Sequence, residues 1–112
     1  MDTEQKKSLA MTGDMSKAAC ARRLQAAIAT TGLANSAIAK MISKQPSSIT
    51  NQVNGDQFPS RDIMAYLYEH HRIDFNFIMA GAYNHLPVDV TEKLFPQLVV
   101  ATKSQDLKTS SD

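Results

Sequence analysis

Two short stretches of helical periodicity, separated by a turn of a few residues, constrain the fold of this chain more than any other feature. In SAIAKMISKQPSSITNQVNG, residues 36–55, Ile38 and Ile42 lie four residues apart, and so do Ile49 and Val53. This spacing places the two side chains of each pair on one face of a helix. Helices this short are not stable alone. The chain must therefore fold as short helices packed against one another.

Starting and stopping signals predict further helices on both sides of this pair. Good N-cap or first-turn residues introduce each of them, and Gly32, Gly55 and Gly81 follow three of them. The expected helices and their starting residues are 17–31 (Ser16), 35–43 (Asn35), 46–54 (Pro46), one after Ser60, and FNFIMA after Asp74, ending at Gly81. No useful strand-like alternation occurs, so the expected fold is a compact all-α domain of five helices with a C-terminal helical extension.

Changes in periodicity and polarity along the sequence divide the chain into four segments. Residues 1–15 lack periodicity and are expected to be a flexible N-terminal arm. Residues 16–85 form the helical domain, and residues 86–102 form a C-terminal helical segment that Pro96 should kink or split. Residues 103–112 are polar and are expected to be a disordered tail.

Composition excludes several classes of protein. The 112 residues contain no apolar run near the ~20 residues needed to span a bilayer, and the polar N-terminus is unlike a secretory signal. One cysteine, Cys20, permits no intramolecular disulfide. We therefore expect a cytoplasmic protein, with Cys20 in the core. The net charge is +1, but residues 17–85 carry +3 and both flanks carry −1, which is a weak signal for nucleic-acid binding.

The helix expected at 46–54 has an unusual outer face. Its exposed positions should carry the short polar side chains of Ser47, Ser48, Thr50, Asn51 and Asn54. Such side chains allow close approach of the backbone to a surface and supply hydrogen-bond donors and acceptors. This chemistry is typical of a recognition helix in the major groove of DNA.

Residues 17–81 resemble the lambda-repressor-like helix-turn-helix family, which includes Cro and the phage repressors. The resemblance rests on residues 36–55, on Phe58-Pro59-Ser60, and on the string from Ile73 to Gly81. Three positions depart from the family pattern: Ser43 replaces the usual turn glycine, and Lys44 and Gln52 replace apolar residues.

The resemblance implies which residues contact DNA. Base edges would be contacted by Gln45, Ser47, Ser48 and Asn51, and phosphates by Asn35, Lys44, Asn54 and Arg61. Lys6 and Lys7 could lie along the duplex. The alternative is that these residues are structural: Ser47 and Ser48 would satisfy first-turn N–H groups, and Asn54-Gly55 would only end the helix.

These features favour a sequence-specific double-stranded DNA-binding transcription regulator, a dimeric repressor of the phage or prophage type that binds a palindromic operator. A bacterial or phage origin would go with this function. The alternative is an antitoxin or adaptor that uses the helix-turn-helix secondarily and holds a regulatory protein partner. No catalytic site, cofactor or metal site can be assembled; His70 and His71 are adjacent and point about 100° apart on a helix.

The C-terminal segment has more apolar residues than a free tail should expose. Leu94, Phe95, Leu98 and Val99 are therefore expected to form the interface of a homodimer. The other arrangement is that they fold back onto the helix at 75–80 of the same chain and extend its core.

Overall fold

The computed structural model describes the backbone of residues 1–110 and the side chains of residues 1–104. Within that part of the chain the secondary structure is entirely helical, which confirms the expected all-α class. The helices are α1 Thr3–Ala10, α2 Lys17–Thr31, α3 Asn35–Met41, α4 Pro46–Val53, α5 Arg61–His71, α6 Phe75–Ala80 and α7 Val88–Ser110. The five helices expected between residues 17 and 81 are α2 to α6.

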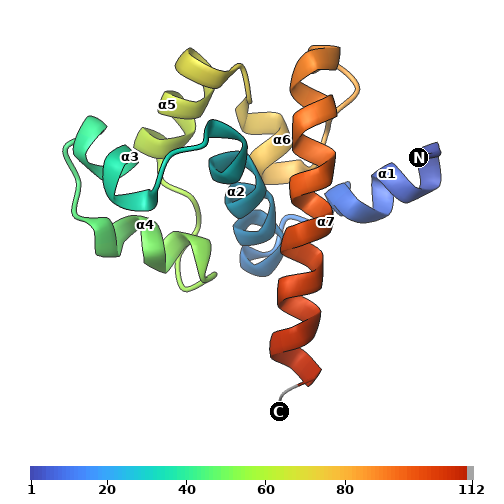
Figure 1. Ribbon diagram of the computed structural model, residues 1–112, viewed down its shortest axis with the longest axis horizontal. Helices are drawn as coiled ribbons and strands as arrows, with labels where there is room; N and C mark the ends of the chain where they lie inside the picture. Colours follow the sequence, from blue (N-terminus) through green and yellow to red (C-terminus); the bar gives the residue numbers. More distant parts are fainter. Residues whose placement is uncertain (111–112) are drawn as a thin grey trace.

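Helix α2 is the centre of the fold. It packs against α4, α5, α6 and α7 (Figure 1). Its small residues, among them Ala19, Ala26 and Ala27, are buried and let the neighbouring helices approach closely. Leu24 and Cys20 are fully buried in the same helix, so the expectation that Cys20 lies in the core is confirmed.

The helix ends follow the local signals closely. Ser16, Ser60 and Asp74 each accept a hydrogen bond from a first-turn N–H, as N-caps do. Gly32 and Gly81 end α2 and α6 in the left-handed conformation. The cap of α3 was predicted wrongly: Ala34 is the N-cap and makes no side-chain bond, and Asn35 is the first helical residue.

The N-terminal segment is not the flexible arm expected for residues 1–15. Asp2 and Gln5 form a capping box, in which each side chain accepts a hydrogen bond from the other's backbone N–H, and α1 follows. The connector after α1 then crosses Gly81, where an added Cβ would lie 2.5 Å from the carbonyl oxygen of Ala10. Only glycine fits this crossing, so the start of the chain is closely packed.

The C-terminal segment is longer than the expected 86–102. Helix α7 begins directly after Pro87 and continues through Ser110, and Pro96 lies inside it without splitting it. The disordered tail expected at 103–112 is therefore helical through Ser110; residues 111–112 lie outside the described part of the chain. None of the described helices is both long enough and apolar enough to cross a bilayer.

Candidate nucleic-acid interface

The turn between α3 and α4 is built by backbone hydrogen bonds around a left-handed residue. Ser43 has φ = +58°, the conformation that glycine adopts most readily. The N–H of Lys44 donates to the carbonyl of Ala39 at 2.9 Å, and the N–H of Ser43 donates to that of Lys40 at 3.3 Å. This pair of bonds is a Schellman motif, which ends α3 sharply and lets α4 start at Pro46. A serine thus performs the turn that the resemblance assigns to glycine.

Helix α4 has one buried face and one exposed polar face. Ile49 is fully buried, and Gln52 is 2% exposed. Ser47, Thr50, Asn51 and Asn54 are exposed. Among the side chains that the structure describes, those of Ser47, Asn51 and Asn54 form no hydrogen bond within the chain. These groups are therefore free to bond a ligand.

The other two expected base-contacting residues, Gln45 and Ser48, differ in whether their side chains are already hydrogen-bonded within the chain. Gln45 is the N-cap residue of α4 but does not cap the helix with its side chain, so its amide is available. Ser48 is only half-exposed, and its hydroxyl accepts a hydrogen bond from Gln52 Nε2 at 3.3 Å. Ser48 is thus engaged within α4, but through the Gln52 side chain and not through the first-turn N–H groups of the alternative interpretation.

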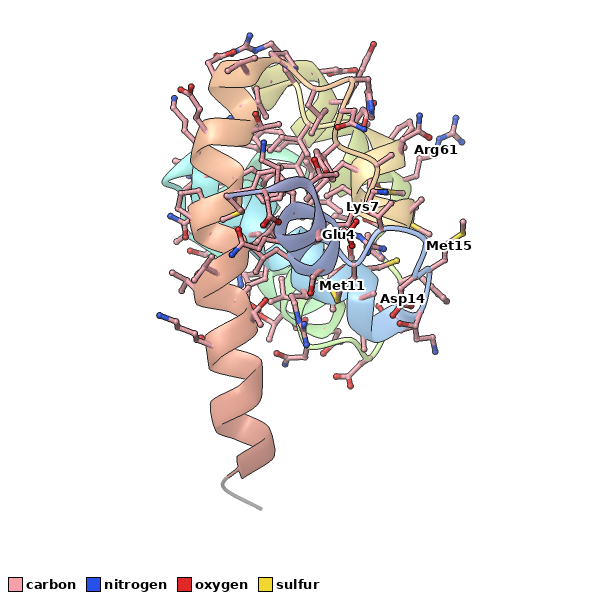
Figure 2. The ribbon with its side chains drawn as sticks, turned by 90° about the vertical axis from the view of Figure 1, so that its right-hand side faces the viewer. Glu4, Lys7, Met11, Asp14, Met15 and Arg61 are labelled. Atoms are coloured by element: carbon pink, nitrogen blue, oxygen red, sulfur yellow. The ribbon has the colours of Figure 1, made fainter. Side chains whose placement is uncertain are left out.

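The expected phosphate-contacting residues lie in the segments that precede and follow α4 in the chain. Asn35 lies at the start of α3 and is half-exposed, and Arg61 is exposed at the start of α5 (Figure 2). Lys44 is exposed and pairs with Asp62, with 3.2 Å between Nζ and Oδ2. Exposed pairs of this kind are weak, so a phosphate can compete for Lys44.

Gln52 explains one departure from the family pattern. Its Oε1 accepts a hydrogen bond from the backbone N–H of Ser60 at 2.7 Å, while its Nε2 donates to Ser48. The buried amide thereby links α4 to the N-cap of α5. The two residues are eight positions apart in the sequence, and no local signal indicates the contact.

The lysines of α1 do not belong to this surface. Helix α1 packs against α7, on the opposite side of α2 from α3 and α4 (Figure 1). The view onto that side shows Lys7 on α1 (Figure 2). Lys6 Nζ lies 5.9 Å from the ring centroid of Phe95 in α7. The expectation that Lys6 and Lys7 lie along a duplex bound by α4 is therefore wrong.

Arg23 is a further positively charged residue that cannot contact a nucleic acid. It is fully buried, and its guanidinium donates to the carbonyl oxygens of Ala10, Met11, Asp14, Ile78 and Met79 at 2.6–3.2 Å. Burial lowers the pKa of Arg23, and nearby Cys20 partly opposes the shift. The basic charge of the middle segment is thus one unit smaller at the surface than the sequence suggests.

The residues expected to form a dimer interface mostly face the core of their own chain. Leu94 and Leu98 are fully buried and Phe95 is 6% exposed, while Val99 is half-buried. The ring of Phe95 packs edge-on against that of Tyr83, with 5.1 Å between centroids. The apolar stripe of α7 covers α2 chiefly, rather than the 75–80 helix, and so these side chains do not form the exposed patch that the dimer argument required.

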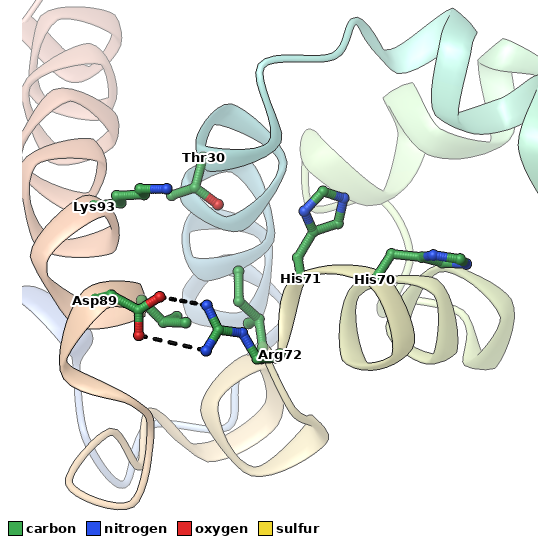
Figure 3. A pocket seen from close by; sticks show the side chains of 8 residues that line it. Thr30, His70, His71, Arg72, Asp89 and Lys93 are labelled. Carbon is green, nitrogen blue, oxygen red and sulfur yellow. Dashed lines mark hydrogen bonds and ion pairs between the residues drawn. The ribbon is translucent and has the colours of Figure 1, made fainter.

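A separate hollow lies between α2, α5 and α7 and is lined by Thr30, His71, Arg72, Asp89 and Lys93 (Figure 3). Arg72 and Asp89 form an ion pair across it, which lowers the pKa of Asp89. Burial lowers the pKa of His71, neighbouring His70 lowers it further, and the His71 ring contacts the Tyr66 hydroxyl at 3.2 Å. The charged groups here are largely engaged with one another, so this hollow is a weaker candidate than the α4 surface.

No family model, no curated protein and no solved structure matches the chain.

Proposed function

We propose that this protein is a sequence-specific double-stranded DNA-binding regulator of transcription, with α3 and α4 as a lambda-repressor-like helix-turn-helix. The observation that carries the proposal is the exposed face of α4, where Ser47, Asn51 and Asn54 have no partner among the described residues. Uncommitted polar groups on a short helix match the hydrogen-bonding edges of bases in the major groove.

The turn before α4 supports the same function. A Schellman motif at Ser43 sets the direction in which α4 leaves α3, and the Gln52–Ser60 bond holds its other end against α5. The recognition helix is thereby fixed at both ends before it meets DNA. A preorganised helix loses little conformational entropy on binding, which favours affinity.

We assign base contacts and phosphate contacts to different residues on and around α4. Asn51 is the best placed for bidentate bonding to an adenine edge, because it is exposed in the second half of α4 and is unpaired within the described chain. Lys44 and Arg61 flank α4 with positive charge and suit phosphate oxygens, which position the protein without selecting a sequence. The negative charge of Asp62, which pairs with Lys44, reduces the positive charge beside α4 and thereby weakens non-specific binding to DNA.

A single α4 offers few base contacts, so specific binding requires two half-sites about one turn of DNA apart. We propose that two copies occupy such a pair of half-sites, as a homodimer on a palindromic operator. Because Leu94, Phe95 and Leu98 are buried within one chain, the two copies meet through other side chains. Binding that blocks a promoter would make the protein a repressor.

Selection of bound duplexes from a random DNA pool tests the function. Enrichment of a palindrome with half-sites about ten base pairs apart is the expected result. Binding with no enriched sequence, or no binding at all, would contradict sequence-specific recognition and favour the alternative of a protein-interaction module.

A further inference from the structure

Two adjoining hollows run along α2 beside the proposed recognition helix. The first lies at the end of α4 and is lined by Arg22, Gln25, Val53 and Asn54, among others. The second continues from it and is lined by Gln25, Val53 and Asn35, among others. Because both hollows are lined by Gln25 and Val53, they adjoin along α2, and we call the two together the α2 trough.

Small residues keep the α2 trough open. Ala18 and Ala21 of α2 line the end of the trough that lies beside Gly55. Gly55 follows α4 and has φ = +84°. A Cβ added at Gly55 would lie 3.7 Å from Cβ of Ala21, so the chain passes close to α2 here. Larger side chains at these three positions would fill the space that the trough occupies.

The polar lining of the α2 trough is rich in donors and free of acids. Arg22, Gln25, Asn35 and Asn54 all carry N–H donors, and no aspartate or glutamate lines either hollow. Arg22 forms no ion pair with the described residues. A lining of this kind suits an anion that accepts several hydrogen bonds.

Arg22 supplies an independent observation. Its Nε is buried and has no hydrogen-bond partner, although the side chain as a whole is only half-buried. A buried donor without an acceptor is destabilising, so bonding within the chain does not account for this placement. Because Nε is buried, a ligand would bond to the terminal guanidinium nitrogens, which are not buried in this way and form no hydrogen bond with the described residues. Their fork is well shaped for phosphate oxygens.

We infer that the α2 trough binds consecutive phosphates of one DNA strand, with Arg22 as its central charge. The inference rests on the proposed function and extends it, because it adds α2 to a DNA surface that was expected only on and around α3 and α4. Asn35 and Asn54 stand at the two ends of the trough, and Gln25 lies between them. The strand would thus run along α2 while α4 enters the groove beside it.

Substitution of Arg22 by methionine tests the inference, with Lys93→Met as the matched control. Both variants lose one positive charge, but Lys93 lies in the hollow between α2, α5 and α7. Binding of each full-length protein to the selected duplex and to a random duplex is measured between 50 and 200 mM salt. We expect Arg22→Met to weaken binding to both duplexes roughly threefold to tenfold and to reduce the slope of log K against log salt by about one.

Lys93→Met should bind like the wild type, and Arg22→Lys should retain most of the salt slope. The melting temperature of Arg22→Met should equal or exceed that of the wild type, because the orphaned donor is removed. Equal binding by Arg22→Met and wild type would overturn the inference while leaving the proposed function intact. A lowered melting temperature with unchanged slope would also overturn it, and failure of the wild type to bind any DNA would overturn both proposals.

Discussion

Gln52 Oε1 lies 2.7 Å from the backbone nitrogen of Ser60 and accepts its hydrogen bond, joining α4 to the start of α5. Gln52 is only 2% exposed, so its polar side chain lies inside the fold. The chain therefore uses a polar residue to hold the proposed recognition helix.

Gln52→Ala should lower the free energy of unfolding by about 1–3 kcal/mol, because the part-buried N–H of Ser60 loses its acceptor. Chemical denaturation measures the change. Gln57→Ala is the control, since Gln57 is exposed in the following loop and its loss should change stability by less than about 0.5 kcal/mol. Equal effects of the two substitutions would show that the buried amide contributes nothing.

Ser43→Gly should stabilise the protein by about 0.5–1 kcal/mol. Ser43 has φ = +58°, where a Cβ is strained and glycine is not. Ser47→Gly is the matched control: Ser47 lies in the first turn of α4, and glycine there should destabilise by about the same amount. In thermal denaturation, we expect Ser43→Gly to raise the melting temperature and Ser47→Gly to lower it. A lower melting temperature for both variants would contradict the left-handed conformation of Ser43.

Arg23→Met should cost more than about 3 kcal/mol, because five carbonyl oxygens would lose their donor inside the fold. Arg23→Lys should rescue little of this loss, since an ammonium group cannot reproduce the guanidinium fork. Urea denaturation at neutral pH is the measurement. A loss within about 0.5 kcal/mol for Arg23→Met would contradict the burial of this residue.

Leu94→Ala should lower stability by about 2–5 kcal/mol, because the side chain is fully buried between α7 and the rest of the chain. Val100→Ala, at a position 55% exposed on the same helix, should have an effect below about 0.5 kcal/mol. The loss for Leu94→Ala should not depend on protein concentration. A loss that disappears on concentrating the protein would instead place Leu94 in a dimer interface.

Local signals predicted most of the helices correctly. Ser16, Ser60, Asp74, Gly32 and Gly81 act through contacts within a few residues of themselves, so sequence spacing is enough to locate them. The capping box of Asp2 and Gln5 is just as local, and it could have indicated α1. It was missed because α1 has few apolar residues and hence no clear helical stripe.

Contacts between segments far apart in the sequence could not be predicted from local signals. The carbonyl partners of Arg23 come from two segments that are more than 50 residues apart, and nothing near Arg23 marks it as buried. The apolar stripe of α7 was recognised, but its partner was not, because α2 and a second chain offer similar apolar surfaces to a sequence-based argument. The exposed face of α4 was predicted correctly except at Ser48, since Ile49 alone fixes which side of so short a helix faces inward.

The most direct test of the central claim compares Asn51→Ala with wild type on the selected duplex and on a random duplex. Asn51 is exposed and free on α4, so its loss should cost about 1–3 kcal/mol on the selected site and relax the preference at one base pair per half-site. Binding to random DNA should be unchanged. Equal losses on both duplexes, or no loss on either, would contradict the assignment of α4 as the helix that recognises the DNA sequence.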